Sequence, residues 1–291
     1  MSSTIVNIPN SFVTFYEANT DIGKSNFITD TICGIQKDFC YPIYDEKDLQ
    51  FQTSFLTDGI LDDSEVTLVR VNSDGSTYNL TGGIISVALT GTNYNVHVNY
   101  NTSDLTTGLS DGDCFTLGLI ISDAGVKGYI SNQCFKKVAD KCLTSKLIYL
   151  NTSNAFGFYY DLGAPSRYNV IRLPIYFKEP VINSDKTVYV RSNGARELLS
   201  ARLSKRYKGI VDHVLEETHQ NLVIALNHDL IRFVPEDYST ANGFQCRFED
   251  EYNNDFPAIM QNVNIWAADF TIFETPFNNF NSNCEWQREY F

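Results

Sequence analysis

The chain has 291 residues, 43% hydrophobic and 13% aromatic, which is the composition of a folded protein and excludes a disordered one. Its 22 basic and 35 acidic residues give a net charge of −13, so the chain as a whole lacks the positive charge typical of nucleic-acid-binding proteins. No apolar run approaches the roughly 18 residues that a membrane-spanning helix needs, so we expect no membrane partner.

The first half of the chain predicts an N-terminal arm followed by a β-sandwich. Residues 1–45 mix turn residues with scattered aromatics, as in an arm with loose first strands. Residues 46–130 contain short runs in which apolar and polar residues alternate, separated by turns rich in Gly, Asn and Asp, which is the pattern of a sandwich domain. The runs are DLQFQTSFL, SEVTLVRVN, TYNLTG, GIISVALTG, NYNVHVNYN and CFTLGLIIS.

The second half predicts a bridging segment and a further β-rich domain. We expect residues 131–163 to bridge the two domains, whereas residues 164–291 again contain alternating runs. Pro174 and Pro180 should mark strand ends or edges, since proline cannot donate to a sheet ladder. With no long linker between them, we expect the two halves to pack closely.

One α-helix is expected, at residues 212–222. Asp212 is a good N-cap, and Val214, Thr218 and Leu222 recur on one face at helical spacing. The segments before and after it alternate as strands do, so the helix should lie across a sheet. The fold class is therefore mainly β, with two β-sandwich-like domains and one short α-helix packed on a sheet of the second.

The seven cysteines form an odd set in a chain whose first residues lack the charged and apolar regions of a signal peptide. We therefore expect free, mostly buried thiols in a reducing cytoplasm. Six residues separate Cys33 from Cys40 and seven separate Cys134 from Cys142, which does not match the spacing of zinc ligands.

Candidate catalytic groups are few and poorly spaced. His213 and His219 are six positions apart, so on a helix they point in different directions and do not form a metal-binding pair. His228 beside Asp229 resembles half of a general-base pair, but no nucleophile motif accompanies it. We predict no catalytic residue, no cofactor and no bound metal.

Weaker alternatives concern acidic loops and aromatic side chains. Asp111 and Asp113 could offer oxygen ligands to calcium, and paired carboxylates elsewhere could serve glycoside hydrolysis. Tyr78, Tyr94 and Tyr100 could stack on sugars. Core and subunit contacts are the favoured use of these tyrosines, because most aromatic side chains of a sandwich face inward.

Several segments of the second half carry a resemblance to known proteins. They are SNQCFKKV, LIYLNTSNAFGFYY, VIRLPIYFKEPV, VYVRSNGARELLSARLSKRYKGIVDHVLEETHQNLVIALNHD and PFNNFNSNC. In these segments the chain resembles structural proteins of tailed phages and prophages of the Bacteroidota, including crAss-like phages. The resemblance implies a tail or neck component that forms a ring around the DNA channel, with a fold similar to tail-tube and distal-tail proteins. It brings no catalytic residues.

We therefore expect a non-enzymatic virion protein, a ring subunit of the tail or neck that is assembled in the host cytoplasm. Its partners would be further copies of itself and neighbouring virion proteins, with DNA only as passing cargo in a channel. The alternative is a carbohydrate-binding β-sandwich module of a receptor-binding or adhesion apparatus, in which the first domain contacts a glycan. The residues expected at a subunit interface are Arg202, Lys205, Arg206, Glu216, Glu217 and Gln220.

Overall fold

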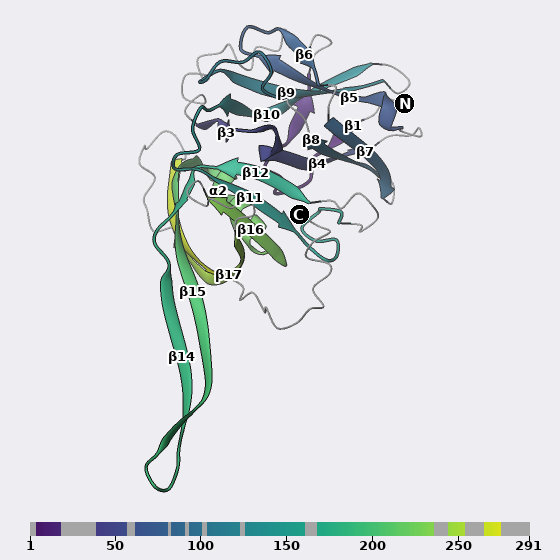
Figure 1. The fold of residues 1–291 in the computed structure, drawn as a ribbon. Coiled ribbons are helices and arrows are strands. Elements are labelled where there is room, and N and C mark those ends of the chain that lie inside the picture. Colours follow the sequence, from purple (N-terminus) through teal and green to yellow (C-terminus); the bar gives the residue numbers. More distant parts are fainter. Residues whose placement is uncertain are drawn as a thin grey trace.

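A computed structural model gives the fold of the chain, drawn in Figure 1. The structure describes residues 4–18, 39–56, 62–80, 83–90, 93–100, 104–122, 126–160, 168–235, 244–253 and 265–274. These residues are mainly β, arranged in two sheets, with one α-helix among them. The expected fold class is confirmed.

The larger sheet has twelve strands and the smaller one six. The larger contains β1 (Thr4–Val6), β4 (Leu49–Leu56), β7 (Gly83–Thr90), β8 (Asn93–Tyr100), β11 (Ser145–Leu150), β12 (Asn169–Leu173), β13 (Ile175–Phe177), β14 (Val181–Val190), β15 (Arg196–Leu215), β16 (Leu230–Pro235), β17 (Phe244–Asn253) and β18 (Ile265–Glu274). The smaller contains β2 (Phe15–Glu17), β3 (Tyr41–Ile43), β5 (Val66–Asn72), β6 (Thr77–Asn79), β9 (Cys114–Ile121) and β10 (Lys127–Lys137). The helix is α2 (Glu216–Leu226), and short 3-10 turns η4 (Glu46–Asp48) and η5 (Asp63–Glu65) precede β4 and β5.

Aromatic side chains fill the space between the two sheets. Phe51 and Phe55 on β4 of the large sheet meet Phe15 on β2 and Tyr129 on β10 of the small sheet, with ring centroids 5.7 and 5.5 Å apart. All four side chains are buried and belong to one continuous core. The alternation that marks these strands in the sequence thus serves a sandwich packed face to face.

The large sheet runs across the boundary predicted between the two halves. Its strands follow the order β13-β15-β18-β17-β16-β11-β12-β4-β8-β7, so β4, β7 and β8 of the first half join the strands of the second. The junction is short: Val170 and Ile171 of β12 pair with Gln50 and Leu49 of β4. Within the predicted bridge, residues 131–163, the chain completes β10 between β2 and β9 and forms β11 between β16 and β12.

Helix α2 begins at Glu216, so the predicted start at Asp212 is wrong. β15 continues through Leu215, and its last residues pair with Trp266 and Ile265 of β18. A strand that is held by a neighbouring strand keeps its backbone donors in the ladder, which here outweighs the capping preference of one aspartate. The helix accordingly starts without a side-chain cap, although two glutamates in its first turn still favour its positive end.

The buried face of α2 matches the predicted face only in part. Thr218 and Leu222 are buried as expected, and the Thr218 hydroxyl lies 3.0 Å from the Tyr41 hydroxyl. Asn221 is also buried, and its amide donates to the backbone carbonyl of Ser11 at 3.0 Å. The helix thereby fastens the N-terminal segment to the second half.

β14 and the first half of β15 form a projecting hairpin, which we call the ribbon (residues 181–206). Its strands pair with each other along their length, and β15 reaches a second partner, β18, only from Arg206 onward among the described residues. Figure 1 shows the ribbon extending away from the other strands of both sheets. At its tip Gly194 has a φ of 80°, which glycine adopts readily, and its N–H donates to the Arg191 carbonyl at 2.8 Å.

A disulfide joins Cys40, just before β3, to Cys134 of β10. The expectation that all seven cysteines are free thiols is therefore wrong for this pair. The two residues are 94 positions apart, and only the fold brings them together. Of the others, Cys114 and Cys246 are buried thiols, Cys142 is an exposed thiol, and Cys33 and Cys284 lie outside the described residues.

We call the chain outside the ribbon the body. We predict that Gly209→Ala destabilises the protein where the ribbon joins the body. A Cβ on Gly209 would lie 2.5 Å from the ring of Phe270 on β18, which is itself buried. Overpacking of this kind costs about 1–3 kcal/mol. Urea unfolding measures the loss, and adding Phe270→Leu as a second change should make the alanine less costly than it is beside phenylalanine. An equal cost in both backgrounds would contradict the assignment.

Candidate functional site

His228, the candidate general base, lies in a closed aromatic cluster. The residue is buried, and four aromatic rings pack around its imidazole with centroid distances between 4.8 and 5.8 Å. These rings belong to Tyr149, Phe156, Phe158 and Tyr160. Burial lowers the pKa of His228 to about 4, so the ring is neutral at pH 7.

Both ring nitrogens of His228 are used inside the cluster. Nδ1 donates to the backbone carbonyl of Ile224 at 2.9 Å, so the neutral ring accepts at Nε2 from the Tyr160 hydroxyl at 2.8 Å. The Asp229 carboxylate is bonded to Thr152 and not to the imidazole of His228. It accepts from the backbone N–H of Thr152 at 3.2 Å and from its hydroxyl at 2.9 Å. The hypothesis of a base with its orienting carboxylate is therefore wrong for this pair.

In the acidic loop before β9, an aspartate that was a candidate calcium ligand is hydrogen-bonded to the backbone of the loop itself. The Asp113 carboxylate accepts the N–H of Ser110 at 2.7 Å, an arrangement that stabilises the turn. Across the part of the chain that the structure describes, three or more His, Cys, Asp or Glu side chains nowhere gather as metal ligands would.

The tyrosines proposed to stack on sugars do not form a platform. Tyr94 is buried, with 9% of its surface exposed, and belongs to the core. Tyr78 is covered by the guanidinium of Arg70, which lies 4.8 Å from its ring centroid. The side chain of Tyr100 lies outside the described residues. For Tyr94 the structure thus agrees with the core reading.

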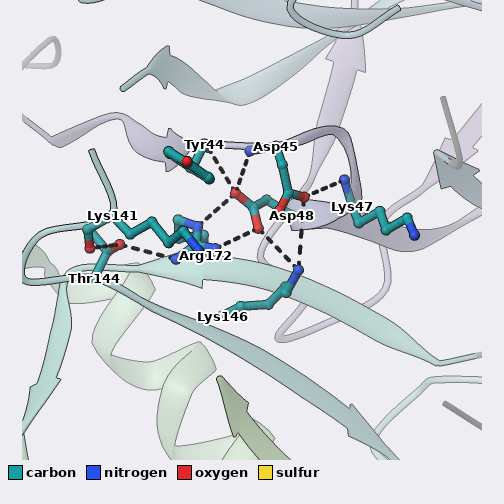
Figure 2. Close-up of polar contacts among 8 residues, drawn as sticks. All are labelled: Tyr44, Asp45, Lys47, Asp48, Lys141, Thr144, Lys146 and Arg172. Carbon is teal, nitrogen blue, oxygen red and sulfur yellow. Dashed lines mark hydrogen bonds and ion pairs between the residues drawn. The ribbon is translucent and has the colours of Figure 1, made fainter. Parts of the chain in front are cut away.

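A buried ion pair links the two halves of the chain (Figure 2). The Arg172 guanidinium on β12 donates from Nε and a terminal nitrogen to the two carboxylate oxygens of Asp48 at 2.6 and 2.9 Å. Backbone N–H groups of Tyr44 and Asp45 donate to the same carboxylate at 2.8 and 3.0 Å. Both charged side chains are almost completely buried: 3% of the Arg172 side chain and none of the Asp48 side chain is exposed.

Further groups around this pair balance its charge. The Lys146 ammonium lies 3.4 Å from Asp48, and Arg172 also donates to the Thr144 hydroxyl at 3.1 Å. Burial alone would raise the pKa of Asp48, but hydrogen bonds and positive charge from Arg172 and Lys146 hold it below the usual value. The network is a structural clamp, because its donors and acceptors are satisfied by one another.

The residues predicted for a subunit interface fall into two separate groups. Lys205 and Arg206 lie at the base of the ribbon, whereas Glu216, Glu217 and Gln220 lie on the first turns of α2. Nine strand residues, about 30 Å at the usual rise of a strand, lie between these groups.

Most of these residues also have partners within the chain. Lys205 lies 3.3 Å from the Glu274 carboxylate, and the Arg206 guanidinium lies 4.7 Å from the Phe273 ring centroid. On α2, Gln133 donates to Glu217 at 3.2 Å and Gln220 donates to Glu216 at 3.3 Å. The side chain of Arg202 lies outside the described residues, and its backbone pairs with Asp185.

The ribbon has surface that other elements leave uncovered, and it is the candidate functional site. Large apolar side chains near its base and tip are 45–61% exposed. They are Val181, Ile182, Val188, Tyr189 and Val190. The tip between them is basic, with Arg191 and Arg196 both exposed. The sequence contained a signal for this hairpin, the turn residues Ser192-Asn193-Gly194 between two alternating runs, but not its separation from the core.

Comparisons of the chain with protein-family models, with curated proteins and with solved structures found no match. Among the described residues, no helix combines the length and the apolar character that crossing a membrane requires.

We predict that Asp48→Asn destabilises the fold by about 3–5 kcal/mol, because it leaves the Arg172 charge buried without its counterion. Asp45→Asn is the matched control: its carboxylate is half exposed and lies farther from Lys146, at 3.8 Å, so about 1 kcal/mol or less should be lost. Chemical denaturation measures both. Equal losses in the two variants would show that the buried pair has no special role.

We predict a loss of stability in acid that depends on His228. Its pKa is about 4 in the folded protein, below the ordinary value near 6.5, so stability is full above pH 6.5 and falls as the pH drops towards 4. His228→Gln keeps a donor and an acceptor but does not titrate. Between pH 7 and about pH 4.5 the parent chain should lose roughly 2–3 kcal/mol more than this variant in urea unfolding. Parallel pH profiles would refute the assignment.

Proposed function

We propose that the protein is a non-enzymatic structural subunit of a tailed-phage particle, which assembles with further copies of itself into a ring of the tail or neck. The observation that carries this proposal is the ribbon. A two-stranded hairpin has no core of its own and is at best marginally stable in water. This hairpin nevertheless presents large exposed apolar side chains and projects beyond the other strands of both sheets, which favours a partner that covers them.

Three further observations support an assembly role. The segments that resemble Bacteroidota phage structural proteins include the tip of the ribbon and all of β15. The candidate base, His228, is a neutral core residue held by backbone and tyrosine contacts. The net charge of −13 suits the wall of a channel through which DNA passes as cargo, because like charge keeps DNA from adhering to it.

The direct test is the state of the full chain in solution and its place in the particle. Light scattering after size-exclusion chromatography should show a defined oligomer, and cryo-EM of particles should locate that ring in the tail or neck. A monodisperse monomer that is absent from particles would overturn the proposal.

We predict that removing the exposed apolar surface of the ribbon weakens assembly without unfolding the subunit. Val181→Thr, Val188→Thr and Val190→Thr together keep the β-branched shape that a strand favours and replace one methyl group with a hydroxyl each. Because these side chains are exposed in the subunit, each change should alter its stability by less than about 0.5 kcal/mol. The oligomer should dissociate at a clearly higher protein concentration than the parent.

The matched control for this variant is Val126→Thr, at a valine that is 76% exposed beside β10 and away from the ribbon. It should assemble as the parent does. If the triple variant and the control assemble equally well, the apolar surface of the ribbon is not part of the subunit contact.

A further inference from the structure

The charges of the chain are divided unequally between the ribbon and the rest. Residues 181–206 contain six basic and two acidic residues, a net charge of +4. The other 265 residues contain 16 basic and 33 acidic residues, a net charge of −17. The ribbon is therefore a positive arm on a strongly negative body.

The surface of the ribbon combines this charge with exposed β-branched side chains and a tyrosine. Tyrosine and arginine are enriched in protein–protein interfaces, where apolar groups are buried at the centre and charged groups lie at the rim. An interface with nucleic acid is more polar and would leave the exposed valines and isoleucine without a role. The chemistry of the ribbon thus fits a negatively charged protein surface better than it fits DNA.

The same charges select between two ways of joining copies of the chain. Two ribbons placed side by side, as in a two-fold dimer, would bring +4 against +4, and like charges in an interface are repulsive. A ribbon laid on the body of another copy brings +4 against −17. The second arrangement uses different surfaces on the two copies, which makes the contact heterologous.

We propose that the ribbon of one copy docks on the acidic body of the next copy, so that the chain joins head to tail. This inference rests on the proposed structural role and specifies its contact. Head-to-tail contacts close into a ring when the rotation between neighbours closes, and otherwise extend into a helix. A ribbon strand of ten residues reaches about 33 Å, which is sufficient to cross onto a neighbouring body.

The first test uses a ribbon-less variant. Residues 183–204 are replaced by Asn-Gly, a two-residue hairpin turn, between Ile182 and Lys205, which already face each other in the ladder. The pairing of β15 with β18 and β13 lies outside the deleted residues and should hold the body together. Circular dichroism and thermal unfolding check the fold, and light scattering should find a monomer.

Mixing distinguishes a head-to-tail contact from a ribbon-to-ribbon contact. A ribbon-less chain still offers a body that accepts a ribbon but offers no ribbon in return, so it should stop growth. About one such chain per ten parent chains, mixed in high salt and dialysed into low salt, should sharply reduce the mass of the assemblies. In a ribbon-to-ribbon contact the variant would be a bystander and the mass of the parent assemblies would not change, which would overturn the inference.

Charge is tested separately, in case the deletion fails to fold. Arg191→Glu with Arg196→Glu at the exposed tip should weaken association at least about tenfold, and raising the salt from about 50 to about 500 mM should weaken that of the parent similarly. Lys47→Glu, an exposed charge reversal on η4, is the control and should have little effect. Equal association of the tip variant and this control would overturn the inference.

The remaining outcomes separate this inference from the proposed function. Parent-like assembly of a folded ribbon-less chain would refute the docking contact and leave the structural role intact. A parent chain that is monomeric and absent from particles would remove both. Binding of duplex DNA by the parent monomer that is lost with the ribbon, measured by fluorescence anisotropy, would replace the docking contact with a nucleic-acid contact.

Discussion

The buried pair of Asp48 and Arg172 is the interaction on which the arrangement of the two halves depends. β12 and β4 share only two paired positions, yet this short ladder makes a single twelve-stranded sheet from strands of both halves. The ion pair lies beside that ladder, and it is satisfied by backbone donors, Lys146 and Thr144. Burying two charges is costly unless they meet in good geometry with their other hydrogen bonds satisfied, as they do here.

The body and the ribbon have different physical requirements. In the body, aromatic side chains from both sheets bury one another, and Thr218 and Asn221 of α2 and the ring of His228 are buried as well. In the ribbon the strands satisfy each other's backbone on one side, and the five large apolar side chains described near its base and tip are exposed. Buried packing and exposed apolar surface are therefore located in separate parts of the same chain, with Gly209 and Phe270 packed where those parts meet.

The sequence predicted local structure well and spatial partners poorly. Runs such as SEVTLVRVN and CFTLGLIIS became β5 and β9, because alternation reports which residues face a core. Alternation does not report which strand lies beside which, and residues 131–163, expected as a bridge, contribute part of β10 and all of β11 to the interior of the two sheets. The predicted start of the helix is wrong for a related reason. The actual start is set by the pairing of Leu215 with β18, which is a contact between residues far apart in the chain.

The basic character of the ribbon, the candidate functional site, can be predicted from the sequence, but its projection from the rest of the fold cannot. The basic residues Lys205 and Arg206, expected at a subunit interface, lie at the base of the ribbon. Among the described residues the pairing of β15 with β18 begins only at Arg206, and no local pattern of the sequence contains this contact. The disulfide had no sequence signal either, since its cysteines are 94 positions apart.

That disulfide gives the first half of the chain an unusual topology. The bond between Cys40 and Cys134 closes a covalent loop that contains β3 through β9 and most of β10. Strands of both sheets belong to this loop, β4, β7 and β8 on one side of the sandwich and β5, β6 and β9 on the other. A single break of the backbone anywhere inside the loop would therefore open the ring without releasing a fragment, and the two pieces would separate only after reduction.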